Sequence, residues 1–301
     1  MPALNEATHI GDVIRRTPTC VDLIVVVDDA STDDTAAAAQ SVGDSRVQVI
    51  RHTARTGVGG ATVSGMRHAL EAGADLIVKV DGDGQMDPLR IESLLQPLVR
   101  DGYDYAKGNR FLHPHALREM PRHRLIGNFI MTFLTKLASG YWHIFDPQNG
   151  YVAAKAATLH ALDLGELAPG FFFENDMLIH LNILNLRVKD VAMPAHYGEE
   201  ESSLRVNRIV ATFPFYLARG LWTRIWEKYV LRDFSPIAMF WLLGLPLMAF
   251  GGILGGTTWI HSLWSGRPAA TGTVMLSVLP FLLGFELILQ AIILEIRESP
   301  R

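Results

Sequence analysis

The chain has 301 residues, of which 49% are hydrophobic, and a formal net charge of −4. That length allows one large domain or two smaller ones. The chain lacks the basic excess of a nucleic-acid-binding protein, so we expect no nucleic-acid partner. A single cysteine, Cys20, excludes an internal disulfide and a metal site built from several cysteines, and it favours a reducing compartment.

Short segments rich in valine, isoleucine and leucine alternate with helical segments over the first third of the chain. This pattern predicts four strands, at residues 22–29, 47–52, 75–83 and 103–111. It predicts helices between them, at residues 31–42, 57–73 and 88–102. Ser31 or Thr32 is the expected N-cap of the first helix. The alternation indicates an α/β fold, with a mostly parallel sheet and helices on both of its faces.

Acidic residues follow two of these strands, and such sheets bind ligands at the carboxyl ends of their strands. Asp81 and Asp83 flank Gly82, and residues two apart in an extended segment share one face. Gln85 adds a neutral oxygen on the same turn. Oxygen ligands of this kind suit Mg²⁺ or Mn²⁺, which keep water and substrate phosphate in their remaining positions. The stretch therefore predicts a divalent metal site that holds a diphosphate, with a solvated acidic turn as the alternative.

A signalling function is a more remote alternative. Asp28, Asp29 and Asp81 could form the acidic cluster of a response-regulator receiver domain, with Lys107 as its lysine. That reading leaves Asp83 and the apolar C-terminal part of the chain unexplained.

The C-terminal part contains two long apolar segments, at about residues 235–260 and 271–296. Each exceeds the roughly 20 residues that a helix needs to cross a hydrocarbon core about 30 Å thick. A short turn-rich link, HSLWSGRPAA, joins them. We predict a transmembrane helical hairpin, with a pair of buried core helices as the alternative.

Basic residues predict the orientation of this hairpin, because they concentrate on the cytoplasmic side. They precede the first segment and follow the second, at Arg219, Arg224, Lys228, Arg232, Arg297 and Arg301. The connecting link has only Arg267. We therefore expect a multi-pass protein of the cell membrane whose residues before about 230 are cytoplasmic.

Three regions follow from these patterns. Residues 1–208 would form the cytoplasmic catalytic domain, 209–232 juxtamembrane amphipathic helices, and 233–301 the two spans. Glu286 is the one acid deep inside the second span, and we expect it to face protein because an ionised group in lipid is costly. The hairpin thereby offers a surface for a homo-oligomer.

Five motifs resemble family 2 glycosyltransferases in their order and spacing. They are PALNE (2–6), VVDDASTDDT (26–35), RTGVGGATVSG (55–65), VDGDGQMDP (80–88) and GNRF (108–111). The resemblance covers about residues 1–205 and is strongest to the polyprenyl-phosphate sugar transferases, which include dolichyl-phosphate mannose synthase. It implies a Rossmann-like GT-A fold and an inverting transfer of a hexosyl group from a UDP- or GDP-sugar. The implied acceptor is polyprenyl phosphate in the membrane, and the implied pathway is cell-envelope glycan synthesis.

The resemblance also implies roles for individual residues. Those lining the nucleoside pocket would be Pro2, Leu4, Glu6, Val27 and Asp29. Asp81, Gly82, Asp83 and Gln85 would hold the metal and the donor diphosphate. Arg110 matches a phosphate-binding arginine, and Arg124 and Asn128 match residues that bind the acceptor phosphate. Guanidinium groups suit this task because they bind phosphate oxygens in a bidentate way.

A second acidic motif, FFFENDMLIHLN (171–182), bears on the acceptor. Glu174 or Asp176 would be the general base if the acceptor were a hydroxyl of a glycan or glycolipid, which is the alternative reaction. A phosphate acceptor is already ionised near pH 7, so these acids would then only position groups or cap a helix. Asp146 in DPQNGYVAAK could lie near the acceptor or simply belong to a turn.

The chain departs from the family at two places. Tyr197 and Ser203 stand where type members have basic residues in a donor-binding loop, and Arg205 or Arg208 could substitute. The family also has a buried strand just before the motif that here begins at Pro2, so we expect the natural chain to start further upstream.

Overall fold

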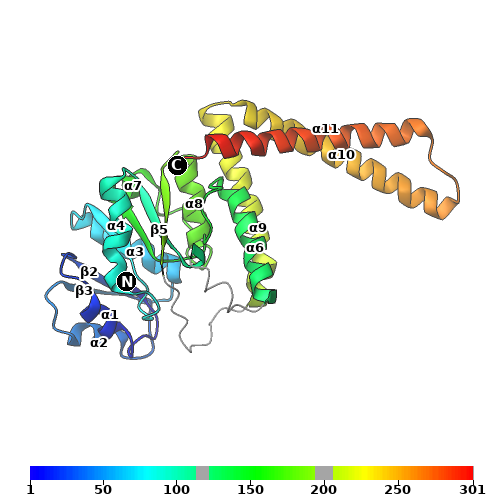
Figure 1. Cartoon of the computed structure of the whole chain (residues 1–301). Coiled ribbons are helices and arrows are strands. Elements are labelled where there is room, and N and C mark those ends of the chain that lie inside the picture. Colours follow the sequence, from blue (N-terminus) through cyan, green and yellow to red (C-terminus); the bar gives the residue numbers. More distant parts are fainter. Residues whose placement is uncertain (113–121, 194–205, 301) are drawn as a thin grey trace. The chain divides into compact units, whose positions relative to one another are not determined.

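The computed structural model describes residues 1–112, 122–193 and 206–300 (Figure 1). The chain folds as two compact units, whose main parts are Met1–Leu221 and Trp222–Ser299. The expected division into three regions at residues 208 and 232 stays a prediction.

The first unit contains two sheets. The first sheet has the order β1 (Pro2–Ala3), β2 (Ile24–Asp28), β3 (Val47–Arg51), and all of its strands are parallel. The second has the order β4 (Leu76–Lys79), β6 (Val152–Lys155), β5 (Tyr105–Asn109), β7 (Val188–Ala192). Strand β6 is antiparallel to both of its neighbours, whereas β5 and β7 are parallel. The predicted α/β class is confirmed, and the first two residues of the PALNE motif form β1 beside β2. The expected start further upstream stays a prediction.

Helices connect these strands. They are α1 (Ile10–Arg16), α2 (Thr35–Ser41), α3 (Val58–Glu71), the 3₁₀ turn η1 (Pro88–Arg90), α4 (Ile91–Arg100), the 3₁₀ turn η2 (Arg110–Leu112), α6 (Arg122–Ser139), α7 (Ala156–Ala161) and α8 (Phe173–Ile183). The predicted N-cap of α2 was wrong, because Asp34 occupies that position. The amide of Ser31 instead donates to Asp28 Oδ1 at 2.8 Å, in the turn before the helix.

Both faces of the second sheet are buried. Successive side chains of a strand point to opposite sides, so neighbouring residues of β6 join different cores. Val152 and Ala154 of β6 join a core with Met66 of α3 and Met177 of α8. Ala153, between them, joins a different core with residues of α4. This two-sided burial holds the carboxyl ends of β4 and β5 at a fixed place in the fold.

In its described part, helix α6 buries two threonines and exposes three large apolar side chains. Its buried side carries Thr132, which donates to the Phe145 carbonyl at 3.3 Å, and Thr135, which donates to Asn175 Oδ1 at 3.0 Å. Its outer side carries exposed Phe129, Ile130 and Phe133. Helices α6, α8 and α9 (Val206–Arg224) share one apolar cluster, so α6 is anchored from within while its outer side stays apolar.

The second unit comprises η3 (Ile225–Arg232), a π-helical turn, followed by α10 (Pro236–Ser265) and α11 (Thr271–Glu298). By length and composition, α10 and α11 could each cross a membrane. Only 28% and 17% of their most apolar windows are buried, which argues against the alternative of core helices. Glycines allow close packing between them: a Cβ on Gly244 would lie 3.0 Å from the Gly284 carbonyl oxygen.

Charged groups in this unit differ in their surroundings. Arg224 and Glu295 are fully buried and form an ion pair at 3.0 Å, and Trp241 Nε1 donates to the other Glu295 oxygen at 3.0 Å. Glu286 is exposed and accepts from Gln290 of the same helix at 2.8 Å. Within this chain Glu286 therefore does not face protein, and its packing against a second copy stays a prediction.

We predict that Glu295→Ala destabilises the protein, because it leaves the guanidinium of Arg224 buried without its carboxylate. Breaking one side of such a pair costs about 3–5 kcal/mol, whereas replacing both sides by apolar groups is often neutral. The thermal unfolding temperature in detergent should therefore fall in Glu295→Ala and largely recover in Arg224→Met/Glu295→Leu. Glu298→Ala, at an exposed position, is the control. A double variant less stable than the single one would contradict the prediction.

Candidate functional site

The Asp-Gly-Asp turn lies directly against the first strand. The amide of Gly82 donates to the Pro2 carbonyl at 3.1 Å. A Cβ on Gly82 would lie 3.1 Å from the Ala3 Cβ and 3.2 Å from Ile10 Cδ1. A glycine between the two acids thus allows this close approach, which brings PALNE and VDGDGQMDP together.

Asp29 connects the second predicted motif to the third. Its carboxylate accepts hydrogen bonds from the amides of Thr56, at 2.8 Å, and Gly57, at 2.7 Å, and lies 2.8 Å from His52 Nδ1. Burial alone would raise the pKa of Asp29, but hydrogen bonds from His52, Thr56 and Gly57 outweigh it and hold the pKa below its usual value. The carboxylate therefore fixes the loop that enters α3.

The other predicted nucleoside-pocket residues divide into two groups. Pro2 pairs with Val27 across β1 and β2, but the Val27 side chain is fully buried and faces α3 at Gly65. Leu4 and Glu6 are partly exposed in the loop after β1. The structure thus places Leu4 and Glu6 in the loop that follows β1, and directs the Val27 side chain inward.

Lys79 joins two acidic motifs that are far apart in the sequence. Its side chain is buried, and Nζ lies 2.8 Å from Asp81 Oδ1 and 3.2 Å from Glu174 Oε1. Burial alone would lower the pKa of Lys79, but the charges of Asp81 and Glu174 outweigh this and raise the pKa above its usual value. The ammonium group stays charged and holds both carboxylates. Sequence reasoning missed this residue, although a lysine inside an otherwise apolar strand was a signal that a buried partner was needed.

Gly150 closes this cluster from the next segment of the chain. A Cβ there would collide with Lys79 Nζ and would lie 3.2 Å from Asp81 Oδ2 and 3.3 Å from Glu174 Oε1. The absence of a side chain at Gly150 is therefore what allows the segment before β6 to pass over the two carboxylates.

The structure separates Glu174 from Asp176, which the sequence left as alternatives. Glu174 lies at the Asp81 cluster, through Lys79. Asp176 instead accepts from the amide of Ala168 at 2.8 Å, and burial raises its pKa. The neighbouring Pro169 carbonyl accepts from the amide of Gly60 in α3, so Asp176 supports a loop that packs on that helix.

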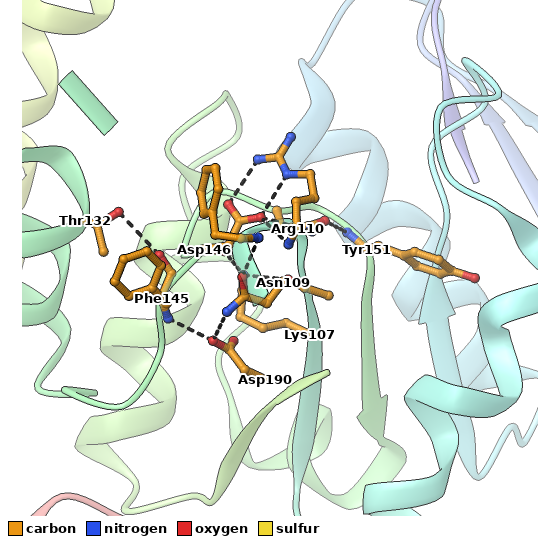
Figure 2. Close-up of polar contacts among 11 residues, drawn as sticks. Lys107, Asn109, Arg110, Thr132, Phe145, Asp146, Tyr151 and Asp190 are labelled. Atoms are coloured by element: carbon orange, nitrogen blue, oxygen red, sulfur yellow. Dashed lines mark hydrogen bonds and ion pairs between the residues drawn. The ribbon is translucent and has the colours of Figure 1, made fainter. Parts of the chain in front are cut away.

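Arg110 forms a bidentate ion pair with Asp146 (Figure 2). Arg110 Nε lies 2.8 Å from Asp146 Oδ2, Nη2 lies 3.0 Å from Oδ1, and the Arg110 amide also donates to Oδ2 at 3.1 Å. Burial alone would raise the pKa of Asp146, but hydrogen bonds from Arg110 and the charges of Arg110 and Lys107 lower it. Asp146 thus contacts Arg110, a predicted phosphate-binding residue, and its place near the acceptor stays a prediction.

Three further residues support this pair, and sequence reasoning did not assign them to the site. Lys107 is fully buried in β5 and donates to the main-chain carbonyl of Asp146. Asp190 Oδ2 accepts from Asn109 Nδ2 at 2.6 Å and from the Phe145 amide at 2.8 Å. Buried charges in the middle of strands were again the available signal. Because Lys107 is enclosed in this way and β6 is antiparallel, the structure does not support the receiver-domain alternative.

The side chains of the remaining predicted residues lie outside the described part of the structure. Arg124 and Asn128 lie on α6, but their side chains fall outside the described residues. Tyr197, Ser203 and Arg205 lie outside the described ranges altogether, and the Arg208 side chain does too. Their assigned roles stay predictions.

The donor set near β4 fits a hard divalent cation that is completed by substrate. Asp81 and Asp83 supply carboxylate oxygens and Gln85 is exposed beside them. Over residues 1–112, 122–193 and 206–300, no group of three or more His, Cys, Asp or Glu side chains could hold a metal by itself. Two carboxylates are nevertheless enough for Mg²⁺ or Mn²⁺ when water and phosphate oxygens fill the other positions.

We predict that Lys79→Ala lowers the thermal unfolding temperature, because two neighbouring carboxylates lose their buried cation. Removing one partner of a buried pair costs on the order of 3–5 kcal/mol. Saturating Mn²⁺ should reduce the loss, since a bound cation would restore a positive charge beside Asp81. Lys189→Ala, at an exposed position, is the control. An unchanged unfolding temperature without Mn²⁺ would disprove the assignment of Lys79.

Comparison with known proteins gives consistent results. Residues 1–160 match the profile of Glycosyl transferase family 2. The chain is 29% identical over 231 residues to a UDP-N-acetylglucosamine–dolichyl-phosphate N-acetylglucosaminyltransferase of Methanococcus voltae, covering 72% of this chain and 92% of that protein. It is 32% identical over 206 residues to an undecaprenyl-phosphate mannosyltransferase of Micrococcus luteus, covering 67% and 83%.

Solved structures show the same fold. A crystal structure of glucosyl-3-phosphoglycerate synthase from Mycobacterium tuberculosis, in complex with Mn²⁺, UDP and phosphoglyceric acid, has a TM-score of 0.55. The two are 23% identical, and the match covers 74% of this chain and 76% of that one. This likeness supports the GT-A-like fold alone. Because the family profile matches 160 of the 301 residues, and a relative above 30% identity covers two thirds of the chain, this protein belongs to glycosyl transferase family 2.

Proposed function

We propose that this protein transfers a hexosyl group, with inversion, from a UDP- or GDP-sugar to polyprenyl phosphate at the cytoplasmic face of the cell membrane. One observation carries the proposal: the segment from Asp146 to Gly150 contacts both halves of the site. Asp146 binds Arg110, and Gly150 lies against Asp81. The four Cα–Cα steps from Asp146 to Gly150 span at most about 15 Å, so the carboxylate turn and the arginine lie within reach of one donor–acceptor pair.

The donor half consists of the Asp-Gly-Asp turn and the adjoining loops. Asp81 and Asp83 would hold Mg²⁺ or Mn²⁺ against the donor diphosphate, with Gln85 beside them. When bound, the cation supplies charge stabilisation for the departing nucleoside diphosphate. Lys79 keeps the Asp81 carboxylate in place from the buried side. Leu4, Glu6 and Asp29 would border the nucleoside.

The acceptor half consists of Arg110 together with Arg124 and Asn128 of α6. A phosphate acceptor is ionised near pH 7 and attacks the anomeric carbon directly, so one displacement inverts the configuration. The surroundings of Glu174 favour this acceptor over a glycan or glycolipid hydroxyl. Glu174 Oε1 already lies 3.2 Å from the buried ammonium group of Lys79, whereas a hydroxyl acceptor would need a carboxylate placed to take its proton.

Membrane lipid is the third partner, and two features of the chain support it. Helices α10 and α11 are long and apolar enough to span, and relatives act on lipid-linked phosphates by name. The exposed apolar side of α6 carries Phe129, Ile130 and Phe133 on the helix that also carries Arg124. A lipid tail could therefore leave the site along α6 while the phosphate stays with the arginines.

The proposal is tested with membranes that contain the full chain, labelled UDP- and GDP-sugars, and polyprenyl phosphate. We expect a chloroform-soluble labelled product from one donor, only when polyprenyl phosphate is present. Membranes without the protein are the control. If labelled sugar appears only on a water-soluble glycan or on a glycolipid, the acceptor assignment is wrong.

We predict that Asp83→Asn abolishes transfer and leaves the fold intact, because it removes a metal-facing charge from a turn outside the core. Transfer should be measured across a titration of Mg²⁺ and Mn²⁺, together with the thermal unfolding temperature. Near-normal turnover at saturating metal would contradict the metal assignment.

We predict that Arg124→Ala loses more activity than Glu174→Gln. A charge-assisted hydrogen bond to a phosphate contributes roughly 1.5–3 kcal/mol, which is about ten- to a hundredfold in rate if it forms in the transition state. Both variants should be assayed in the same membranes with donor saturating. A dead Glu174→Gln enzyme beside a healthy Arg124→Ala enzyme would favour a hydroxyl acceptor instead.

A further inference from the structure

Asp146 is a buried carboxylate whose only side-chain ion pair in the described part of the chain is with a partly exposed arginine. We propose that Asp146 is a positioning residue, which fixes the guanidinium of Arg110 in one orientation for the acceptor phosphate. The inference rests on the proposed function, in which Arg110 binds that phosphate.

The geometry of the pair is that of a fixed fork. Asp146 binds the Nε and Nη2 edge of the guanidinium with both of its oxygens, at 2.8 and 3.0 Å. A planar guanidinium held at two points cannot rotate about its last bonds without breaking both. The Nη1 end of the group points away from the carboxylate, and the Arg110 side chain is 39% exposed whereas Asp146 is 2% exposed. Asp146 therefore holds the guanidinium group of Arg110 from the buried side.

Asp146 is itself fixed to the sheet by buried contacts (Figure 2). Its main-chain carbonyl accepts from Lys107 of β5, and its carboxylate also accepts from Asn149 at 3.3 Å. The amide of the preceding Phe145 donates to Asp190 of β7. The main chain at Phe145 and Asp146 is thus attached to two adjacent strands, β5 and β7, and this fixes the position from which the carboxylate holds Arg110.

The charges of Asp146 and Arg110 determine how the pair would act on the acceptor phosphate. Asp146 compensates the positive charge of Arg110, so the pair attracts a dianion through directed N–H groups more than through net charge. Loss of Asp146 would leave Arg110 positively charged but free to adopt other rotamers. Acceptor binding should then persist while the reactive geometry is lost, and a misplacement of about 1 Å can cost roughly a hundredfold in rate.

Asp146→Asn is the primary variant because it keeps the size of the side chain and removes its charge. We expect kcat to fall about ten- to a hundredfold, with the KM for polyprenyl phosphate changed much less. Binding of UDP or GDP with Mn²⁺, measured by calorimetry, should match the wild type and reports an intact donor half. A rise in acceptor KM with unchanged kcat would overturn the proposal.

A double-mutant cycle with Arg110→Ala separates positioning from a general structural effect. If Asp146 acts through Arg110, adding Asp146→Asn to Arg110→Ala should leave kcat almost unchanged, since the group that it positions is already gone. If Asp146→Asn lowers kcat by the same factor in both backgrounds, Asp146 acts independently of Arg110 and the proposal is wrong. Should Asp146→Asn fail to fold, Asp146→Glu serves in the same cycle, because it keeps the charge but displaces the carboxylate.

Chemical rescue distinguishes positioning of Arg110 by Asp146 from a purely structural role of Asp146. Free guanidinium ion added to Arg110→Ala should restore part of the activity, because both carboxylate oxygens of Asp146 can still bind it. The Arg110→Ala/Asp146→Asn enzyme should show no such rescue. Equal rescue of both enzymes would overturn the proposal. If wild-type membranes form no labelled polyprenyl product from any donor, the proposed function fails instead, which is a different result from either outcome of the cycle.

Discussion

The buried ammonium group of Lys79 is the contact on which the rest of the site depends. It bridges Asp81, at the end of β4, and Glu174, at the start of α8, two residues that lie 93 positions apart (174 − 81). Two carboxylates that share one buried partner would repel each other in a low-dielectric interior unless that partner were a cation. Because Lys79 supplies that cation, the strand end, the helix start and the glycine segment at Gly150 can converge on one point.

The segment Asp146–Gly150 turns this local cluster into a two-part site. At one end Gly150 approaches the donor-side carboxylates, and at the other end Asp146 holds Arg110. Both contacts depend on groups that are unusual for their surroundings: a glycine that avoids a collision and a buried carboxylate that needs a cation. The proposed donor and acceptor halves are therefore coupled through the main chain, so a displacement of this short segment would disturb both.

Polar groups in apolar surroundings also have partners elsewhere in the chain. In the second unit, the buried pair Arg224–Glu295 is completed by Trp241, which gives the carboxylate a second donor. In the first unit, α6 turns threonines inward and phenylalanines outward. In both places a buried polar group has a partner within the protein.

The sequence by itself determined what depends on neighbouring residues. Runs of β-branched residues located β2 and β3, uncharged stretches located α10 and α11, and the spacing of Asp81 and Asp83 indicated a metal site. Tertiary structure decided what depends on partners far away in the chain. It set the antiparallel direction of β6, placed Glu174 rather than Asp176 at the site, and paired Lys79, Lys107, Asp146 and Asp190 with their contacts. Periodicity and hydropathy record only which side chains are buried, whereas the partner that makes a buried charge tolerable is chosen when distant strands and helices come together.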